Sequence, residues 1–361
     1  MITESRAALD GTQDRRDYLG PVQVLCLAGL CAVGAELLAA YADNTGNVPA
    51  VLFALVFFAA LYGAPALLAR EVARRAGWGW PSLLLLTLAL GIAQACLIDQ
   101  SLFSEDYFAY EGWAESRLAA FIPALSISAN QALNFIIGHV IFSFGAPIAI
   151  AEAWRPRRAL QPWLGPVGMT IAAVAYVGTA LLIAFDPESQ NASTAQFITS
   201  AALVTACALA AWLVGTTFGY KERAEGRASS ASPVLVFAAT LPLALLLASD
   251  VLGESWSGVA FNATVIAVVG GLVWWRAQRP GWSVRHAAAV ALAFLVSRGA
   301  LAFTYFPLVG QVEPTAKYAH NVVMMLLIFM AGWFALCQQR CSGNMGRDAN
   351  AEDEASEIDG A

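Results

Sequence analysis

Ten long apolar stretches dominate the sequence, and this pattern limits what the chain can fold into. A helix needs about 20 apolar residues to cross the hydrocarbon core of a bilayer. Transmembrane strands would instead read as segments of about ten residues with alternating polarity, which the sequence lacks. The predicted fold is therefore an all-α, polytopic bundle of about ten transmembrane helices. The stretches cover residues 21–41, 49–69, 81–98, 127–151, 163–185, 197–217, 233–250, 257–275, 286–307 and 319–337.

The composition excludes a water-soluble protein. Hydrophobic residues make up 58% of the 361 residues, and charged residues only 13%, against about 25% in a soluble domain. The formal net charge of −6 argues against a nucleic-acid partner, because such binding depends on Lys and Arg neutralising phosphates. The expected partner is the lipid bilayer, and the predicted location is a bacterial inner (plasma) membrane, since the Arg-, Ala- and Leu-rich composition is typical of GC-rich bacterial genes.

Basic residues predict the orientation, because cytoplasmic loops carry an excess of Lys and Arg. All but three of the 20 Lys and Arg residues fall before the first stretch, in alternate loops or in the tail. The exceptions are Arg117 and Lys317 on the opposite side and Arg298 inside the ninth stretch. Both termini are therefore predicted to be cytoplasmic. The predicted organisation is a cytoplasmic segment 1–20, a bundle 21–337 with an external loop 99–123, and an acidic, disordered cytoplasmic tail 338–361.

Five polar side chains lie at similar depth in five different stretches. Counted from the cytoplasmic ends, they are 12–15 residues in, which corresponds to about 18–22 Å at 1.5 Å per residue. Because ionisable residues inside membranes are costly, they usually face the bundle interior. Glu36 and Arg298 are the charged members of this layer, and we expect them to form a buried ion pair. The layer consists of Glu36, Gln94, His139, Asn262 and Arg298.

A second polar group is predicted nearer the outside, where it would form an outer vestibule. It comprises Asp99, Asn130, Gln131, Asn134, Asp250, His320 and Asn321. The stretch 127–151 is the most polar. At 100° per residue, Asn130 and Asn134 share one face, and His139 and Ser143 share another. A helix with two polar faces should lie at the centre of the bundle or line a water-filled cavity.

No sequence motif points to a cofactor, a metal or a nucleotide. The six Cys residues form no C-x-x-C pair, and a metal site needs several converging His, Cys or carboxylate ligands. The Walker A, G-x-G-x-x-G, H-E-x-x-H and G-x-S-x-G patterns are all missing. ATP-driven transport by this chain alone is therefore excluded, and neither a cofactor nor a metal is expected.

Two resemblances bear on function. The stretches Tyr62–Pro65, Gln100–Phe103 and Gly138–Ala153 are similar to uncharacterised polytopic membrane proteins of GC-rich bacteria, which implies no activity. The pattern Phe135-x-x-x-His139 resembles the second motif of the CAAX-type intramembrane proteases. The first motif of that family, two Glu with a nearby Arg, is missing, so the resemblance implies a non-catalytic relative.

Three functions are compatible with the sequence. The favoured one is a transporter or permease with an outward-facing polar pocket for a small solute or cation. The first alternative is a structural or sensory membrane subunit, in which the polar residues only hold helices together. The second is an intramembrane hydrolase or a non-catalytic relative of one. Convergence of the five layer residues on one cavity would favour transport, and a carboxylate hydrogen-bonded to His139 or His320 would favour a hydrolase.

Overall fold

The computed structural model describes residues 19–39, 41, 44–217, 231–306 and 312–337. Within these ranges nine helical spans are long and apolar enough to cross a membrane, and the shorter apolar helix α11 (Pro233–Ala248) is a tenth helix of the bundle. The prediction of an all-α bundle of about ten helices is therefore confirmed. The spans cover Gly20–Ala39, Val48–Arg75, Trp80–Ile98, Ala129–Trp154, Pro166–Ala184, Thr194–Thr217, Trp256–Ala277, Val284–Leu301 and Pro314–Cys337.

Several of these spans are composite. The first contains α2 (Leu19–Ala35) and the 3-10 turn η1 (Leu37–Ala39), and the second contains α3 (Val48–Phe58), η2 (Ala59–Gly63) and α4 (Ala64–Arg75). The third joins α5 (Trp80–Ala93) to η3 (Gln94–Ile98). The fourth joins four elements, and the later spans are single helices. The four elements are α7 (Ala129–Ala132), η6 (Leu133–Ile137), η7 (His139–Gly145) and α8 (Ala146–Trp154). The single helices are α9 (Pro166–Ala184), α10 (Thr194–Thr217), α12 (Trp256–Ala277), α13 (Val284–Leu301) and α14 (Pro314–Cys337).

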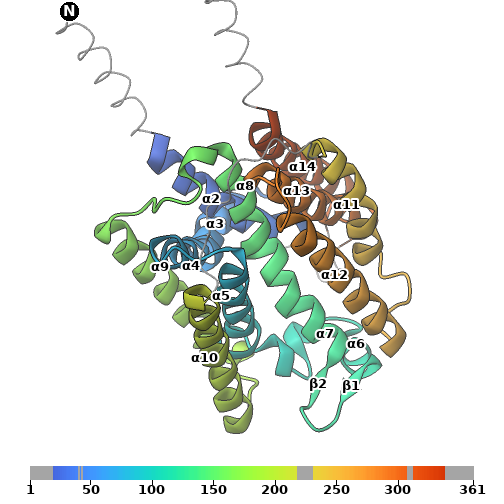
Figure 1. The fold of residues 1–361 in the computed structure, drawn as a ribbon. Coiled ribbons are helices and arrows are strands. Elements are labelled where there is room, and N and C mark those ends of the chain that lie inside the picture. Colours follow the sequence, from blue (N-terminus) through green and yellow to red (C-terminus); the bar gives the residue numbers. More distant parts are fainter. Residues whose placement is uncertain (1–18, 40, 42–43, 218–230, 307–311, 338–361) are drawn as a thin grey trace, which may run out of the picture.

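The bundle has two distinct ends (Figure 1). The start of α2 and the end of α14 lie at one end, which we call the terminal end. The opposite end, the loop end, carries α6 (Trp113–Ala119) and a short antiparallel hairpin of β1 (Phe121–Ile122) and β2 (Ile127–Ser128). The segment predicted as the loop 99–123 thus contains the 3-10 turns η4 (Ser101–Phe103) and η5 (Tyr107–Ala109), helix α6 and strand β1.

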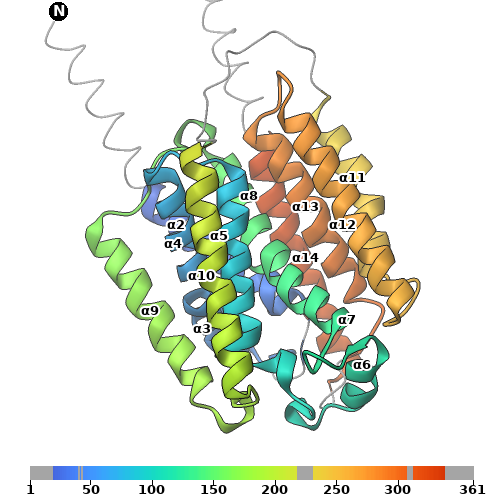
Figure 2. The same cartoon turned by 60° about the horizontal axis from the view of Figure 1, so that its bottom comes forward.

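The fourth span is central, as its two polar faces predicted. It crosses the bundle obliquely between one group of helices (α2–α5, α9 and α10) and a second group (α11–α14), as Figure 2 shows. Its second half, η7 and α8, packs on α2 and α5 in the first group and on α13 and α14 in the second. Helices α9 and α10 are peripheral, since only 6% and 11% of the residues in their most apolar stretches are buried inside the protein. Their exposed Leu, Ile and Val side chains are suited to contact lipid.

Four π-helical segments interrupt the first group of helices and the central span. They are η2, η3, η6 and η7. A π segment adds a residue to the turn and occurs frequently at functional sites. Segment η6 begins between Asn130 and Asn134. The two residues therefore do not share a face, although an ideal α-helix predicted that they would. Asn130 is buried, with 1% of its surface exposed, whereas Asn134 is exposed.

Close helix approach in this region depends on glycine. A Cβ built on Gly34 of α2 would lie 2.4 Å from the backbone oxygen of Phe142 in η7. A Cβ on Gly91 of α5 would lie 2.8 Å from the backbone oxygen of Ile136. Small residues at membrane helix contacts let two backbones approach closely. These two glycines bring α2 and α5 against the central span.

Candidate functional site

Helix α2 stops short of the loop end. The α-helix ends at Ala35, although Glu36 N still donates to Ala32 O at 3.1 Å; Glu36 forms a turn, and η1 follows. The last carbonyls of a helix have no partner within the helix, and an unsatisfied group in a bilayer costs several kcal/mol. Side chains from the C-terminal region occupy these carbonyls. Arg298 Nη2 donates to Ala35 O at 3.0 Å, His320 Nε2 bonds Leu37 O at 2.7 Å, and Tyr305 Oη donates to Ala39 O at 2.7 Å.

Glu36 is joined to a row of side chains from the second span and the central fourth span. The Tyr62 hydroxyl donates to Glu36 Oε1 at 2.7 Å. The Tyr62 ring stacks on the His139 imidazole with 5.4 Å between centroids. His139 Nδ1 in turn bonds Ser143 Oγ at 2.9 Å, as their shared helical face predicted. Glu36, Tyr62, His139 and Ser143 therefore form one continuous polar and aromatic row.

This row lies near the middle of the membrane-spanning region. Tyr62 is 14 residues after Val48 and 13 before Arg75, the two limits of its span. At about 1.5 Å per residue, it is roughly 20 Å along the span from either limit. Tyr62 belongs to η2, and His139 begins η7. The row is therefore built on two π segments and on the turn that follows α2.

Arg298 lies beside Glu36 but does not form the expected direct ion pair with it. In the part of the chain that the structure describes, no Glu36–Arg298 contact falls within ion-pair distance. The guanidinium instead caps Ala35 O and lies over the Phe142 ring, 4.8 Å from its centroid. A cation is favourable there, because the C-terminus of a helix carries partial negative charge.

Gln94 and Asp99 form a second part of the site. Gln94 Nε2 donates to Asp99 Oδ2 at 3.3 Å, and the backbone N and Oγ of Ser101 donate to Asp99 Oδ1 at 2.9 and 2.8 Å. Gln94 is 2% exposed and starts the π segment η3. Asp99, predicted as a vestibule residue, therefore bonds a residue of the predicted inner layer.

The remaining predicted residues do not join this group by any described contact. Asn262 is buried on α12, and its Oδ1, like that of buried Asn130, has no hydrogen-bond partner among the described residues. Asp250 is exposed in the turn after α11. Asn321, next to His320 on α14, donates to Ala302 O at 2.9 Å. Of the two predicted groups, Glu36, His139, Arg298 and His320 are connected by contacts around the end of α2, whereas Gln94 and Asp99 contact each other.

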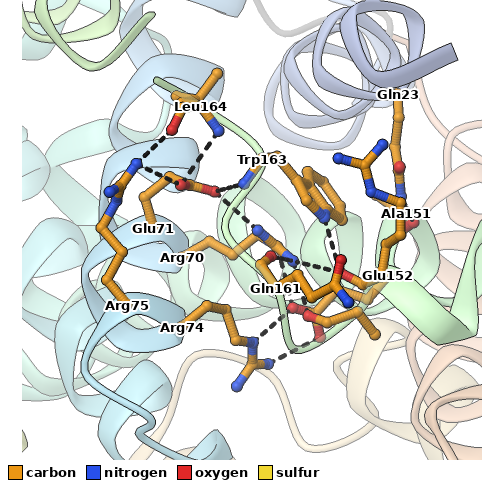
Figure 3. A network of polar contacts seen from close by, with 12 residues as sticks. Gln23, Arg70, Glu71, Arg74, Arg75, Ala151, Glu152, Gln161, Trp163 and Leu164 are labelled. Carbon is orange, nitrogen blue, oxygen red and sulfur yellow. Dashed lines mark hydrogen bonds and ion pairs between the residues drawn. The ribbon is translucent and has the colours of Figure 1, made fainter. Parts of the chain in front are cut away.

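A second buried polar network lies at the terminal end (Figure 3). Glu152 of α8 accepts hydrogen bonds from Arg74 Nε and Nη2, both at 2.8 Å, and from Arg70 Nε at 3.0 Å. Arg70 also pairs with Glu71 at 2.9 Å, and its guanidinium lies 3.4 Å from the centroid of the Trp163 ring. Each of Arg70, Glu71 and Glu152 has at most 1% of its surface exposed. Arg70 and Arg74 were expected in a loop, but α4 continues through both.

The network joins α4 to α8 and to the connection that follows α8. Arg70 Nη2 donates to the backbone oxygens of Ala159 and Gln161 at 2.7 and 3.0 Å. Glu71 accepts from the backbone N–H groups of Trp163 and Leu164 at 2.7 and 3.2 Å. Every charged group therefore has several partners, which is the pattern of a structural joint. We distinguish it from the site around Glu36, whose carboxylate receives a single neutral hydrogen bond among the described contacts.

Comparison with known proteins gives no match: no family model, no curated protein and no solved structure is similar to this chain at a significant level. The fold alone shows the class of protein, which is a multi-pass, all-α membrane protein. Its function must be argued from the geometry around Glu36.

Proposed function

We propose that this protein is a membrane transporter that moves a small solute or cation past Glu36. The observation that carries the proposal is the end of α2 at Ala35, where Glu36 forms a turn and the carbonyls of Ala35, Leu37 and Ala39 are bonded by side chains from the C-terminal region. Backbone exposed within a bilayer is tolerated only where protein buries it or where it lines a water-filled cavity. Secondary transporters use interrupted helices near the midplane in this way to bind substrates and coupling ions.

The surroundings of Glu36 support this reading over a purely structural one. Tyr62 and His139 both stand on π segments, whereas an inert packing contact needs no such departure from the α-helix. Glu36 also differs from the carboxylates of the terminal-end network, which are each bonded to arginine. A carboxylate without a bonded cation is able to take up a proton or a cationic ligand.

The hydrolase alternative gains no support from the histidines. His139 bonds a serine hydroxyl, and His320 bonds a backbone carbonyl. Neither imidazole has a described hydrogen bond to a carboxylate, which would orient it as a general base.

We further propose that the terminal end faces the cytoplasm of a bacterial cell. Arg75, Arg155 and Arg276 lie near the terminal-end limits of their spans, and the positive-inside rule assigns that side to the cytoplasm. The Glu36 site is then nearer the outer surface than the arginine network.

Flux measurements on the full chain in proteoliposomes test the transport proposal. Vesicles are loaded with a pH-sensitive dye and exposed to a clamped potential, with H⁺, Na⁺, K⁺ and a panel of small amines and neutral solutes as probes. We expect flux above that of empty liposomes, its loss in Glu36→Gln, and its retention in Glu105→Gln, whose side chain is 84% exposed. No flux for any probe, or equal flux in Glu36→Gln and wild type, would overturn the proposal.

A further inference from the structure

The backbone at the end of α2 does not offer free oxygen ligands to a metal cation. Transporters that bind Na⁺ at an interrupted helix use the unpaired carbonyls of that helix as ligands. The three carbonyls described at this end are instead bonded by side chains, those of Arg298, His320 and Tyr305. Among the described residues, no group of three or more His, Cys, Asp or Glu side chains is arranged to hold a metal ion. Glu36 therefore lacks the shell of oxygen atoms that a metal cation requires.

The contacts of Arg298 do not depend on the charge of Glu36. Its guanidinium donates to Ala35 O at 3.0 Å and lies 4.8 Å from the centroid of the Phe142 ring. Both partners are neutral, and the partial negative charge at the end of the helix stabilises the cation. A loss of the charge on Glu36 therefore breaks none of the described contacts of Arg298.

The hydrogen bond from Tyr62 fits both protonation states of Glu36. The hydroxyl donates to Oε1 at 2.7 Å, and a carboxylic acid that is protonated on Oε2 still accepts at Oε1. Glu152 is the opposite case, because it accepts three hydrogen bonds from two buried arginines. A proton on Glu152 would leave buried positive charge without its counter-ion. Glu36 is thus the carboxylate whose described surroundings tolerate a change of charge.

The other ionisable groups on the elements that pack against α2 and η1 have contacts of their own. His139 of η7 bonds Ser143, and His320 of α14 bonds Leu37 O. Lys317, one turn before His320, lies among aromatic rings. Helix α3 carries no ionisable side chain, and those of α4 and α8 belong to the terminal-end network. Among these described contacts, only the Tyr62 hydroxyl bonds the Glu36 carboxylate.

We propose that the coupling ion at this site is H⁺ and that Glu36 carries it. The inference rests on the proposed transport function, because it names the ion that moves through the same site. The Glu36 carboxylate takes a proton from a hydronium ion on one side, which leaves water and the neutral carboxylic acid. The acid later returns the proton to water on the other side. Tyr62 is a positioning residue, which holds the carboxyl group and keeps its own proton.

Infrared spectroscopy of the full-length protein in lipid membranes measures the protonation of Glu36 separately from transport. Spectra are recorded at about pH 6 and about pH 9, both above the range in which exposed carboxyl groups titrate. We expect the C=O band of a protonated carboxylic acid at the lower pH and its loss at the higher pH. Glu36→Gln should remove the band, and Glu105→Gln, at a side chain that is 84% exposed, should retain it. Identical bands in Glu36→Gln and wild type, or a band that persists at about pH 9, would overturn the proposal.

Tyr62→Phe tests the geometry of the site, because it removes the hydroxyl and keeps the ring that stacks on His139. A hydrogen bond to an ionised carboxylate is about twice as strong as one to a neutral group, so its loss favours the protonated acid. The midpoint of the Glu36 band should therefore rise by roughly one pH unit, a tenfold gain in proton affinity. Tyr318→Phe is the matched control and should leave the midpoint unchanged. An unchanged or lowered midpoint in Tyr62→Phe would contradict the assignment of the titrating group to Glu36.

Flux into proteoliposomes separates this inference from the transport proposal on which it rests. A pH gradient, with equal Na⁺ and K⁺ on both sides, should drive flux in wild type and not in Glu36→Gln. Flux that depends on Glu36 but follows a Na⁺ or K⁺ gradient without a pH gradient would leave transport standing and refute H⁺ as the ion. An infrared band of Glu36 without any flux would support the proton site and refute transport.

Discussion

Replacing Glu152 by glutamine should destabilise the protein strongly. The carboxylate receives three hydrogen bonds from Arg70 and Arg74 at 2.8–3.0 Å and is 1% exposed. Glu152→Gln keeps the shape of the side chain but removes its charge and turns an N–H group toward an arginine. Arg70 then keeps its pair with Glu71, whereas Arg74 keeps only its hydrogen bond to Trp78 O among the described contacts. Removing one partner of a buried ion pair costs about 3–5 kcal/mol.

Thermal unfolding in detergent, followed by tryptophan fluorescence, measures this effect. At roughly 2 °C per kcal/mol for a large chain, Glu152→Gln should lower the Tm by at least about 6 °C. Glu105→Gln is the matched control, because it breaks a 3.3 Å pair with Arg117 in which Glu105 is 84% exposed. Such an exposed pair contributes about 0–1 kcal/mol.

A double variant distinguishes the loss of charge balance from a general failure to fold. Glu152→Leu combined with Arg74→Met removes a charge of each sign, and Arg70 keeps its 2.9 Å pair with Glu71. Replacing a buried pair by apolar residues is often neutral or stabilising, so the double variant should unfold at a higher temperature than Glu152→Gln. A Tm of Glu152→Gln equal to that of Glu105→Gln would refute the reasoning.

Three further predictions concern packing, pH and topology. Gly34→Val should prevent folding, because a Cβ at this position would lie 2.4 Å from Phe142 O. Gly178→Val is the control and should fold normally, because a Cβ there would have no atom within 4 Å. Size-exclusion chromatography compares the two variants. Hydrogen bonds from the backbone N–H groups of Ala316 and Thr315 lower the pKa of the Glu313 carboxyl below 4.5. The Tm of wild type should therefore exceed that of Glu313→Gln by a constant amount above pH 4.5. This difference should decrease as the pH falls through the lowered pKa. A C-terminal reporter that fluoresces only in the cytoplasm should be bright, and a dark reporter would reverse the proposed orientation.

The helices could be predicted from the sequence because their physical cause is local. An apolar run of sufficient length must satisfy its backbone within itself, so length and hydropathy suffice to find it. The same reasoning placed Arg70 and Arg74 in a loop, because α4 continues beyond its apolar run. Their four-residue spacing, which brings side chains to one helical face, was the available signal that both contact one partner.

The geometry of the site depended on contacts that no local pattern contains. Glu36, His139 and Arg298 were identified because charged and imidazole groups are rare in membrane spans. Tyr62, the residue that joins two of them, carries no charge and does not stand out in an apolar, aromatic stretch. The π segments were also hidden, because hydrophobic periodicity assumes 3.6 residues per turn.

The way the end of α2 is satisfied has a consequence for biosynthesis. The partners of Ala35 and Leu37 are Arg298 and His320, which are 263 and 283 positions later in the chain. The first span therefore enters the membrane well before the residues that cap it have been synthesised. Its final turn must remain near the polar interface, or be held by other partners, until α13 and α14 arrive. Completion of the first helix is thus one of the last events in the assembly of this protein.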